Sequence, residues 1–197
     1  MSLQSPTQES PRVRATRNAL QEGLLSLLEE LPISRITISM VCLKAEVHRS
    51  TFYLYYKDIY DLLEHIQDTL YQELMKAITK TPVYLPSTEL LSRVYKVVYH
   101  HNKLSRVLFG QYGDREFLRK VSDIYRNVLI DEWKKIDEQL DARTLDYIHS
   151  FITFTNMGIM VKWVTNNFTE SPEELAEMAS RFLLCGISCF LSVPLPM

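Results

Sequence analysis

Apolar residues recur every three to four positions along most of this 197-residue chain, and no stretch alternates apolar with polar residues as a half-buried strand does. This period is that of an α-helix with one buried face. The composition, with 46% hydrophobic residues, 5 glycines and 8 prolines, is that of an ordered protein large enough for one large or two small domains. The sequence therefore predicts an all-α fold.

Several short signals mark where helices begin. Ser10-Pro11 combines an N-cap with a first-turn proline, and Ser171-Pro172-Glu173-Glu174 adds a capping-box glutamate to the same pattern. Thr37 is positioned to cap a short helix, and Asp58 with Asp61 resembles a capping box. The pattern predicts a helix from Pro11 to before Pro32, short helices after Thr37 and from Arg49 to Tyr56, and longer ones from Asp58 toward Lys80 and at about 87–102, 103–109, 114–137, 142–167 and 172–193.

Charge and cysteine content limit the class of protein. Residues 1–57 carry seven Lys or Arg against five Asp or Glu, and residues 58–197 carry fifteen against nineteen, a mild asymmetry within a net charge of -2. Cys42, Cys185 and Cys189 cannot all pair within one chain and stand in apolar helical sequence, which predicts buried, reduced thiols. We find no leader peptide and no apolar stretch of about 20 residues. A cytoplasmic protein that does not enter the membrane is expected.

Residues 37–57 have the outline of a helix-turn-helix, because two short helices joined by a tight turn at Glu46-Val47-His48 stand between two longer ones. If the helix from Arg49 enters a major groove, Arg49 is placed for a bidentate contact with guanine, and Ser50 and Thr51 are placed to reach bases or phosphates. This arrangement predicts a DNA-reading segment near the N-terminus.

The residues that follow fit the same geometry. Val47 and Phe52 are expected to anchor the second short helix to the domain. Tyr53, Tyr55 and Lys57 would then lie along the flank that faces the sugar-phosphate backbone. Tyrosines on helices are more often partly buried packing residues, so it is their order within the segment that favours DNA binding.

Residues 36–58 resemble the DNA-binding signature of the TetR family, most specifically in the triplet Thr51-Phe52-Tyr53, in Tyr55-Tyr56-Lys57 and in the pair Leu62-Leu63. The part after residue 87 is similar to the subgroup whose C-terminal domain is typical of Firmicutes. The resemblance implies an all-helical, homodimeric DNA-binding protein in which Tyr56 belongs chiefly to the core. Its implied DNA-contacting set is Thr37, His48, Arg49, Ser50, Thr51, Tyr53, Tyr55 and Lys57.

The sequence departs from this family pattern at two positions. Glu46 stands where the family usually has a glycine, so the turn either contains a strained residue with positive φ or takes another form. Ile59 stands where the family often has a phosphate-binding lysine. Both departures lower the DNA affinity that we expect, and neither disturbs the hydrophobic pattern.

Residues 87–193 contain many aromatic and methionine side chains. In relatives of the TetR type this domain often encloses an effector pocket, although the same helical spacing fits an ordinary buried stripe equally well. The effector itself is not predicted. The candidate ligand-binding residues are Tyr99, Phe109, Tyr125, Phe151, Phe154 and Met157.

The last two helices are the expected dimer interface, because they combine small residues for close approach with large ones for burial. The alternative is that this face belongs to the core of a single chain. The candidate interface residues are Trp163, Ala179, Phe182, Leu183, Gly186 and Phe190.

Together these features predict a DNA-binding domain at 1–57, a connecting helix and linker at 58–86, and a regulatory and dimerisation domain at 87–197. The expected function is that of a transcriptional regulator, most simply a repressor, that binds a pseudo-palindromic operator as a dimer and is released by a small effector. An enzyme is disfavoured because no catalytic, phosphate-binding or zinc-binding motif occurs, and no cofactor is expected. A second alternative is a regulator-like helical module that acts through a protein partner, with DNA binding weakened by Glu46 and Ile59.

Overall fold

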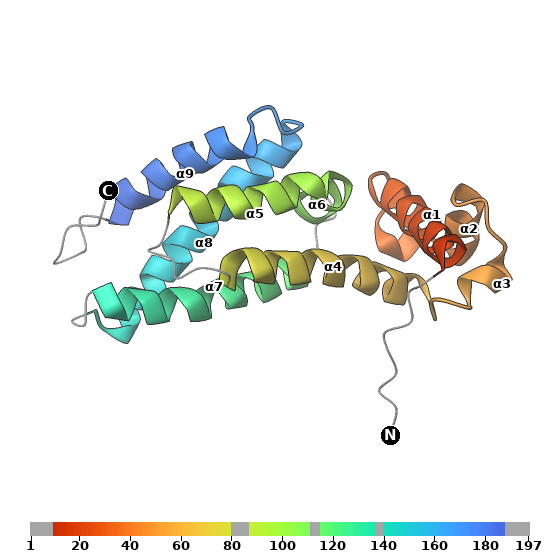
Figure 1. Cartoon of the computed structure of the whole chain (residues 1–197), viewed down its shortest axis with the longest axis horizontal. Helices are drawn as coiled ribbons and strands as arrows, with labels where there is room; N and C mark the ends of the chain where they lie inside the picture. Colours follow the sequence, from red (N-terminus) through yellow and green to blue (C-terminus); the bar gives the residue numbers. More distant parts are fainter. Residues whose placement is uncertain (1–9, 80–86, 111–114, 137–139, 188–197) are drawn as a thin grey trace, which may run out of the picture. The chain divides into compact units, whose positions relative to one another are not determined.

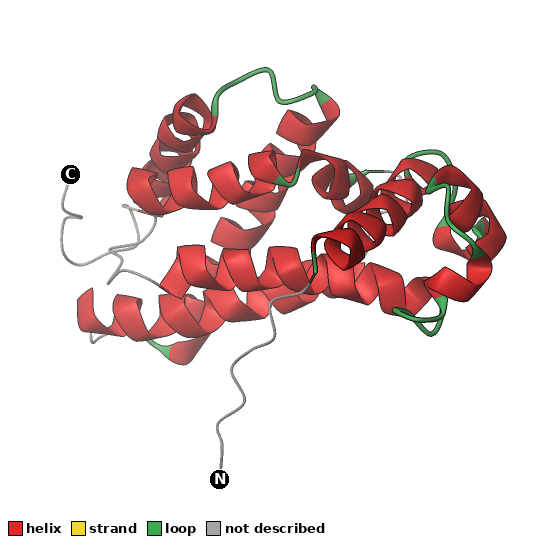
Figure 2. Cartoon of the chain, turned by 45° about the vertical axis from the view of Figure 1, so that its right-hand side comes forward, coloured by secondary structure: helices red, strands yellow, loops and turns green. Residues whose placement is uncertain are grey.

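The computed structural model describes residues 10–79, 87–110, 115–136 and 140–187, and every regular element in these ranges is a helix (Figure 2). The all-α prediction is confirmed. The predicted connection at 81–86 lies outside the described residues. The elements are α1 (Pro11–Leu28), the short 3-10 helix η1 (Ile33–Arg35), α2 (Ile38–Lys44), α3 (Arg49–Phe52), α4 (Ile59–Thr79), α5 (Thr88–His100), α6 (Asn102–Phe109), α7 (Arg115–Ile136), α8 (Ala142–Thr165) and α9 (Pro172–Ile187).

The predicted caps are formed. The hydroxyl oxygen of Ser10 accepts a hydrogen bond from the backbone N–H of Val13 at 3.4 Å. At the start of α9, the backbone N–H of Glu174 donates to the Ser171 hydroxyl at 3.2 Å, and the Glu174 carboxylate accepts from the Ser171 backbone N–H at 2.8 Å. These bonds satisfy N–H groups that have no partner within the helix, which is why the local sequence fixes where each helix begins.

The chain divides into two compact units, Met1–Ile66 (unit 1) and Gln67–Met197 (unit 2), and the division falls inside the continuous helix α4. It therefore lies within the segment 58–86 that the sequence assigns to a connecting helix and linker. The predicted stripe of α4 is buried as expected, at Leu62, Ile66, Leu70 and Leu74.

Unit 1 is built from α1, η1, α2, α3 and the first turns of α4, with α2 packed against both α1 and α3. Gly23 allows α1 to approach α2 closely, because a Cβ atom added there would lie 3.2 Å from the carbonyl oxygen of Val41. The side chains with no exposed surface in this core are Leu20, Leu24, Val41, Phe52 and Leu62. Burial of these apolar side chains holds the short helices α2 and α3, which are too short to be stable alone.

Unit 2 is a helical bundle in which α9 lies along α5, while α8 packs against α6, α7 and α9 (Figure 1). Its largest buried side chains are Trp133, Trp163 and Tyr95. The indole N–H of Trp163 donates to the carbonyl oxygen of Glu170 at 2.9 Å, which ties the end of α8 to the loop before α9. Among the described helices, none combines the length and the apolar character that crossing a bilayer requires.

Helix α1 ends at Leu28, before Pro32 as predicted, and the chain then enters a turn and η1. Two other local predictions were wrong. Helix α3 ends at Phe52 and not at Tyr56, although residues 53–55 continue as turns. Cys185 is exposed while Cys42 is buried, since α9 turns Cys185 away from the core. Cys189 and Phe190 lie outside the described residues.

Candidate nucleic-acid interface

The turn between α2 and α3 has the backbone conformation that usually requires glycine. Glu46 has a φ of 56°, in the left-handed region, and its backbone N–H donates to the carbonyl oxygen of Leu43 at 3.3 Å. The N–H of Val47 then donates to the carbonyl oxygen of Cys42 at 3.0 Å. The turn therefore contains a strained residue with positive φ, which was one of the two forms expected from the sequence. For a residue with a Cβ atom this conformation costs on the order of 1 kcal/mol of folding free energy.

Helix α3 presents one face to solvent and buries the other. Phe52 and Tyr56 are buried, as predicted for both residues, and their rings pack at a centroid distance of 5.8 Å. Val47 is half-buried. On the outward side, the side chains of His48, Arg49, Ser50 and Tyr53 are exposed and that of Thr51 is half-buried. The opening turn of α3 is thus accessible, as an element that enters a DNA groove must be.

Arg49 and Tyr53 lie one helical turn apart on this exposed face. A terminal nitrogen of the Arg49 guanidinium donates to the Tyr53 hydroxyl at 3.5 Å, a weak contact that leaves the remaining guanidinium donors for other acceptors. The positive charge of Arg49 also lowers the pKa of the buried Cys42 thiol, but the stronger effect of burial raises that pKa above its ordinary value. Cys42 is therefore a protonated core residue.

The segment from Tyr55 to Asp61 fixes the entry to α4. Both carboxylates act on backbone groups, since Asp58 accepts from the N–H of Tyr60 at 2.8 Å and Asp61 accepts from the N–H of Lys57 at 2.8 Å. The Lys57 side chain is exposed and Tyr55 is half-buried. Ile59 is buried, so this position contributes to the core and offers no side-chain donor where the family often has a lysine.

Thr37 plays the local role predicted for it. Its hydroxyl oxygen accepts a hydrogen bond from the backbone N–H of Met40 at 3.3 Å, which caps α2. Thr37 thus stands at the start of α2. The other seven predicted DNA-contacting residues lie between the N-cap of α3 at His48 and Lys57, just before α4.

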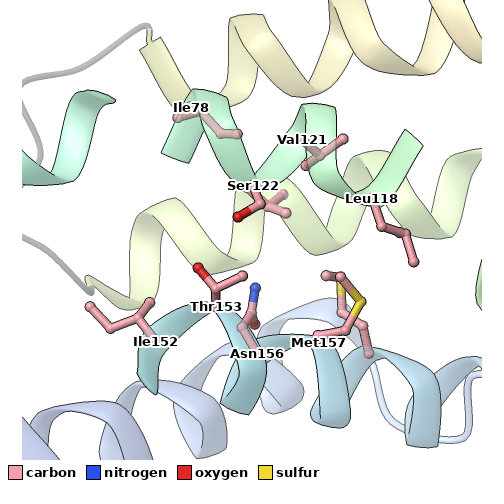
Figure 3. A pocket seen from close by; sticks show the side chains of 10 residues that line it. Ile78, Leu118, Val121, Ser122, Ile152, Thr153, Asn156 and Met157 are labelled. Atoms are coloured by element: carbon pink, nitrogen blue, oxygen red, sulfur yellow. The ribbon is translucent and has the colours of Figure 1, made fainter. Parts of the chain in front are cut away.

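A small cavity lies in unit 2 among α4, α5, α7 and α8, and Figure 3 shows the side chains that line it. Its volume is about 40 Å³, enough for one or two water molecules. Most lining residues are apolar, and Ser122, Thr153 and Asn156 are polar. The Asn156 side-chain oxygen accepts a hydrogen bond from the Tyr95 hydroxyl, and in Figure 3 its nitrogen points into the cavity toward Ser122.

The predicted ligand-binding residues do not converge on this cavity. Met157 lines it, whereas Phe109 is buried elsewhere and Tyr99 is half-exposed beside Trp163, with ring centroids 6.1 Å apart. Phe151 and Phe154 are exposed, and the side chain of Tyr125 lies outside the described part of the chain. Sequence reasoning missed Asn156, whose signal is a single amide within the apolar series of α8.

A stripe of exposed apolar side chains follows α8 and continues on α9, and we name it the α8–α9 stripe. On α8 its members follow one another at intervals of four, three and seven residues and so share one face. Phe154 is 76% exposed and Phe182 57% exposed, which is unusual for phenylalanine in a folded protein. The members are Tyr147, Phe151, Phe154, Val161, Met178 and Phe182.

The predicted dimer residues divide between this stripe and the core. Ala179 and Leu183 are buried within the protomer because α5 covers the inner face of α9. Trp163 of α8 is buried against Tyr95 and Tyr99 of α5. Phe182 belongs to the stripe. Gly186 faces Phe151, since a Cβ atom added there would lie 2.6 Å from the edge of that ring.

The family model TetR_C_8, described as "Transcriptional regulator C-terminal region", matches residues 87–184. The uncharacterized HTH-type transcriptional regulator YxbF of Bacillus subtilis strain 168 is 23% identical over 164 residues. This match covers 80% of the chain and 42% of that protein, so the chain spans less than half the length of its curated relative.

Solved structures share the fold. The TetR transcriptional regulator from Streptococcus agalactiae 2603V has a TM-score of 0.62 at 20% identity, covering 87% of this chain and 95% of its own. FadR from Bacillus subtilis in complex with stearoyl-CoA has a TM-score of 0.63 at 19% identity, covering 86% and 98%. The matched family and these structures are those of transcriptional regulators and not of enzymes.

Proposed function

The chain belongs to the TetR family of transcriptional regulators, and on that premise we propose that unit 1 binds double-stranded DNA with the opening turn of α3 in the major groove. The observation that carries the proposal is the division of α3 into a buried face, held by Phe52 and Tyr56, and an exposed face that offers Arg49 and Tyr53. Arg49 is the proposed guanine reader, and Tyr53, Tyr55 and Lys57 are the proposed phosphate contacts.

The test begins with selection of bound sequences from random double-stranded DNA, followed by mobility-shift titration at several salt concentrations. We expect a salt-sensitive complex on a pseudo-palindromic sequence. Arg49→Ala should cost about 1 to 3 kcal/mol of binding free energy and relax the choice of base at one position. Lys120→Ala, which removes an exposed lysine from α7 in unit 2, is the control. If no sequence gave a salt-sensitive complex, a module acting through a protein partner would be favoured.

We further propose that two copies associate through the α8–α9 stripe. Support comes from its composition, because aromatic and methionine side chains are enriched at the centres of protein interfaces, and from its continuity over two packed helices. A two-fold dimer of this kind would present two α3 helices to one duplex, which is why a pseudo-palindromic operator is expected.

The dimer is tested by sedimentation of Phe154→Asp and Phe182→Asp variants. The wild-type chain should sediment at twice its mass of 23.1 kDa, and each variant should shift toward the monomer. Tyr60→Asp, which changes an exposed aromatic residue at the start of α4, should leave the dimer intact. Dimers in both stripe variants would refute this interface.

We also propose that a mostly apolar effector enters the cavity beside Asn156 and releases the DNA. Support comes from the apolar lining, from the amide nitrogen that points into the cavity, and from the stearoyl-CoA complex of a protein with this fold. Known ligand pockets enclose roughly 300 to 1,000 Å³, so α7 and α8 must separate to admit such a molecule.

The effector proposal is tested by adding stearoyl-CoA or acetyl-CoA to the DNA complex, since the two probes differ only in their acyl chain. Release by stearoyl-CoA alone, lost in Asn156→Leu, would support the proposal. Release by neither probe would refute an acyl-chain effector. We propose that the protein is a repressor. A reporter gene placed behind the selected operator tests this, because a repressor lowers expression of the reporter when it binds the operator.

A further inference from the structure

Leu54 is an exposed residue of unit 1 to which the proposed function gives no role. It is 75% exposed, and it follows α3 directly. Among the described residues of unit 1, the large hydrophobic side chains with comparable exposure are Leu43, Tyr53 and Tyr60. The two tyrosines carry a hydroxyl group for polar partners, and Leu43 lies on α2. Leu54 is thus a purely apolar side chain in the segment led by Arg49.

The backbone places Leu54 on the same side as the exposed start of α3. The N–H of Leu54 donates to the carbonyl oxygen of Thr51 at 3.3 Å, and the N–H of Tyr56 donates to that of Phe52 at 3.0 Å, so the chain continues its helical course past Phe52. Residues four apart on such a course share a face. Phe52 and Tyr56 occupy the buried face, which leaves Ser50 and Leu54 together on the exposed one.

A DNA duplex offers few partners for such a side chain. Phosphate oxygens and the edges of guanine, cytosine and adenine in the major groove present charges, donors or acceptors, whereas thymine presents the C5 methyl group as well. A leucine side chain that packs against this methyl group stabilises the complex, because both apolar groups are removed from water.

We infer that Leu54 contacts the C5 methyl group of a thymine in each half-site and thereby sets a preference for thymine at that position. The inference rests on the proposed DNA binding by unit 1. Leu54, one turn beyond Ser50, would add an apolar contact to the polar contacts proposed for Arg49 and Tyr53.

The experiment uses the operator selected for the full chain, with each thymine replaced in turn by deoxyuridine, which lacks only the methyl group. At one position in each half-site, wild-type affinity should fall about fourfold, the worth of one methyl-sized group removed from water. Leu54→Ala should bind thymine and uracil equally at that position. Leu54→Met, which keeps an apolar side chain, should restore the preference.

Leu43→Ala is the matched control, because Leu43 is 82% exposed on α2, outside the segment led by Arg49. This variant should keep the wild-type preference. The inference is overturned if wild type is indifferent to uracil at every position, if Leu54→Ala keeps the full preference, or if Leu43→Ala loses it. Failure of the wild-type chain to bind any DNA would instead refute the proposed function on which the inference rests.

Discussion

Arg17 of α1 and Tyr56, which follows α3, contact each other in two ways. The Nε–H group of Arg17 donates to the Tyr56 hydroxyl at 3.3 Å, and the guanidinium carbon lies 5.8 Å from the centre of the same ring. The tyrosine ring also packs against Phe52 and against His65 of α4. Tyr56 therefore joins α1, α3 and α4, and Arg17 contributes to the structure of unit 1 whether or not it also attracts phosphate.

Tyr56→Phe should destabilise unit 1 by about 1 kcal/mol, because it removes the acceptor of a part-buried hydrogen bond and keeps the ring. Urea unfolding followed by circular dichroism measures the change. Tyr55→Phe, at a half-buried position beside it, is the matched control and should cost less. Equal stability of wild type and Tyr56→Phe would show that the Arg17 contact contributes nothing.

Glu46→Gly should stabilise unit 1 by about 1 kcal/mol, since glycine adopts a φ of 56° without the steric cost that a Cβ atom imposes. The change also removes a negative charge next to α3 and should strengthen DNA binding, most clearly at low salt. Ala45→Gly is the control, because Ala45 has a right-handed helical φ of -85° and gains nothing from glycine. A less stable Glu46→Gly protein would contradict the prediction.

Lys57→Ala should weaken binding to all DNA sequences alike and reduce the slope of log K against log salt by about 0.9 for each phosphate contact that is lost. The reason is that a phosphate contact carries no base information but releases counterions. Lys162→Ala, at an exposed position on α8 in unit 2, should leave the slope unchanged. An unchanged slope in Lys57→Ala would remove this residue from the phosphate-binding set.

The stability of unit 2 should fall in mild acid because of His149. Burial is the main cause that lowers the pKa of His149 below its ordinary value, against a hydrogen bond to the backbone of Ser122 that raises it. The unfolded chain therefore takes up this proton at a higher pH than the folded one. The free energy of unfolding should decrease as pH falls from the unfolded pKa of about 6.5 toward the lower folded value.

His149→Gln should flatten this dependence. Urea unfolding at a series of pH values between 7 and 5, followed by circular dichroism, measures the slope for both proteins. An equal slope in wild type and variant would assign the acid sensitivity to other groups.

The helix starts and the core of unit 1 were predictable, because each rests on residues close together in sequence. Ser10, Thr37 and Ser171 cap helices through contacts spanning three residues, and the periodicity of α4 gave its buried stripe. The end of α3 was not predictable to the residue, since the same apolar spacing at Phe52 and Tyr56 fits a helix and a series of turns.

The burial of individual residues in unit 2 was not predictable, for a different reason. Periodicity assigns a residue to one face of its helix, but it does not say which neighbouring helix covers that face. Trp163 and Leu183 are covered by other helices of the same unit, whereas Phe151 and Phe154, predicted to bind a ligand, are exposed. The partner of Asn156 is Tyr95, 61 residues away, a pairing that only the packing of the helices determines.

The chain has two tryptophans, Trp133 and Trp163, and both are buried in unit 2. Indole emission moves to longer wavelength when water reaches the ring, so the fluorescence of this protein follows the opening of unit 2. Unit 1 contributes helices but no indole group. If unit 1 unfolds first, ellipticity falls while the emission maximum stays in place, and the two units can be followed separately in one unlabelled sample.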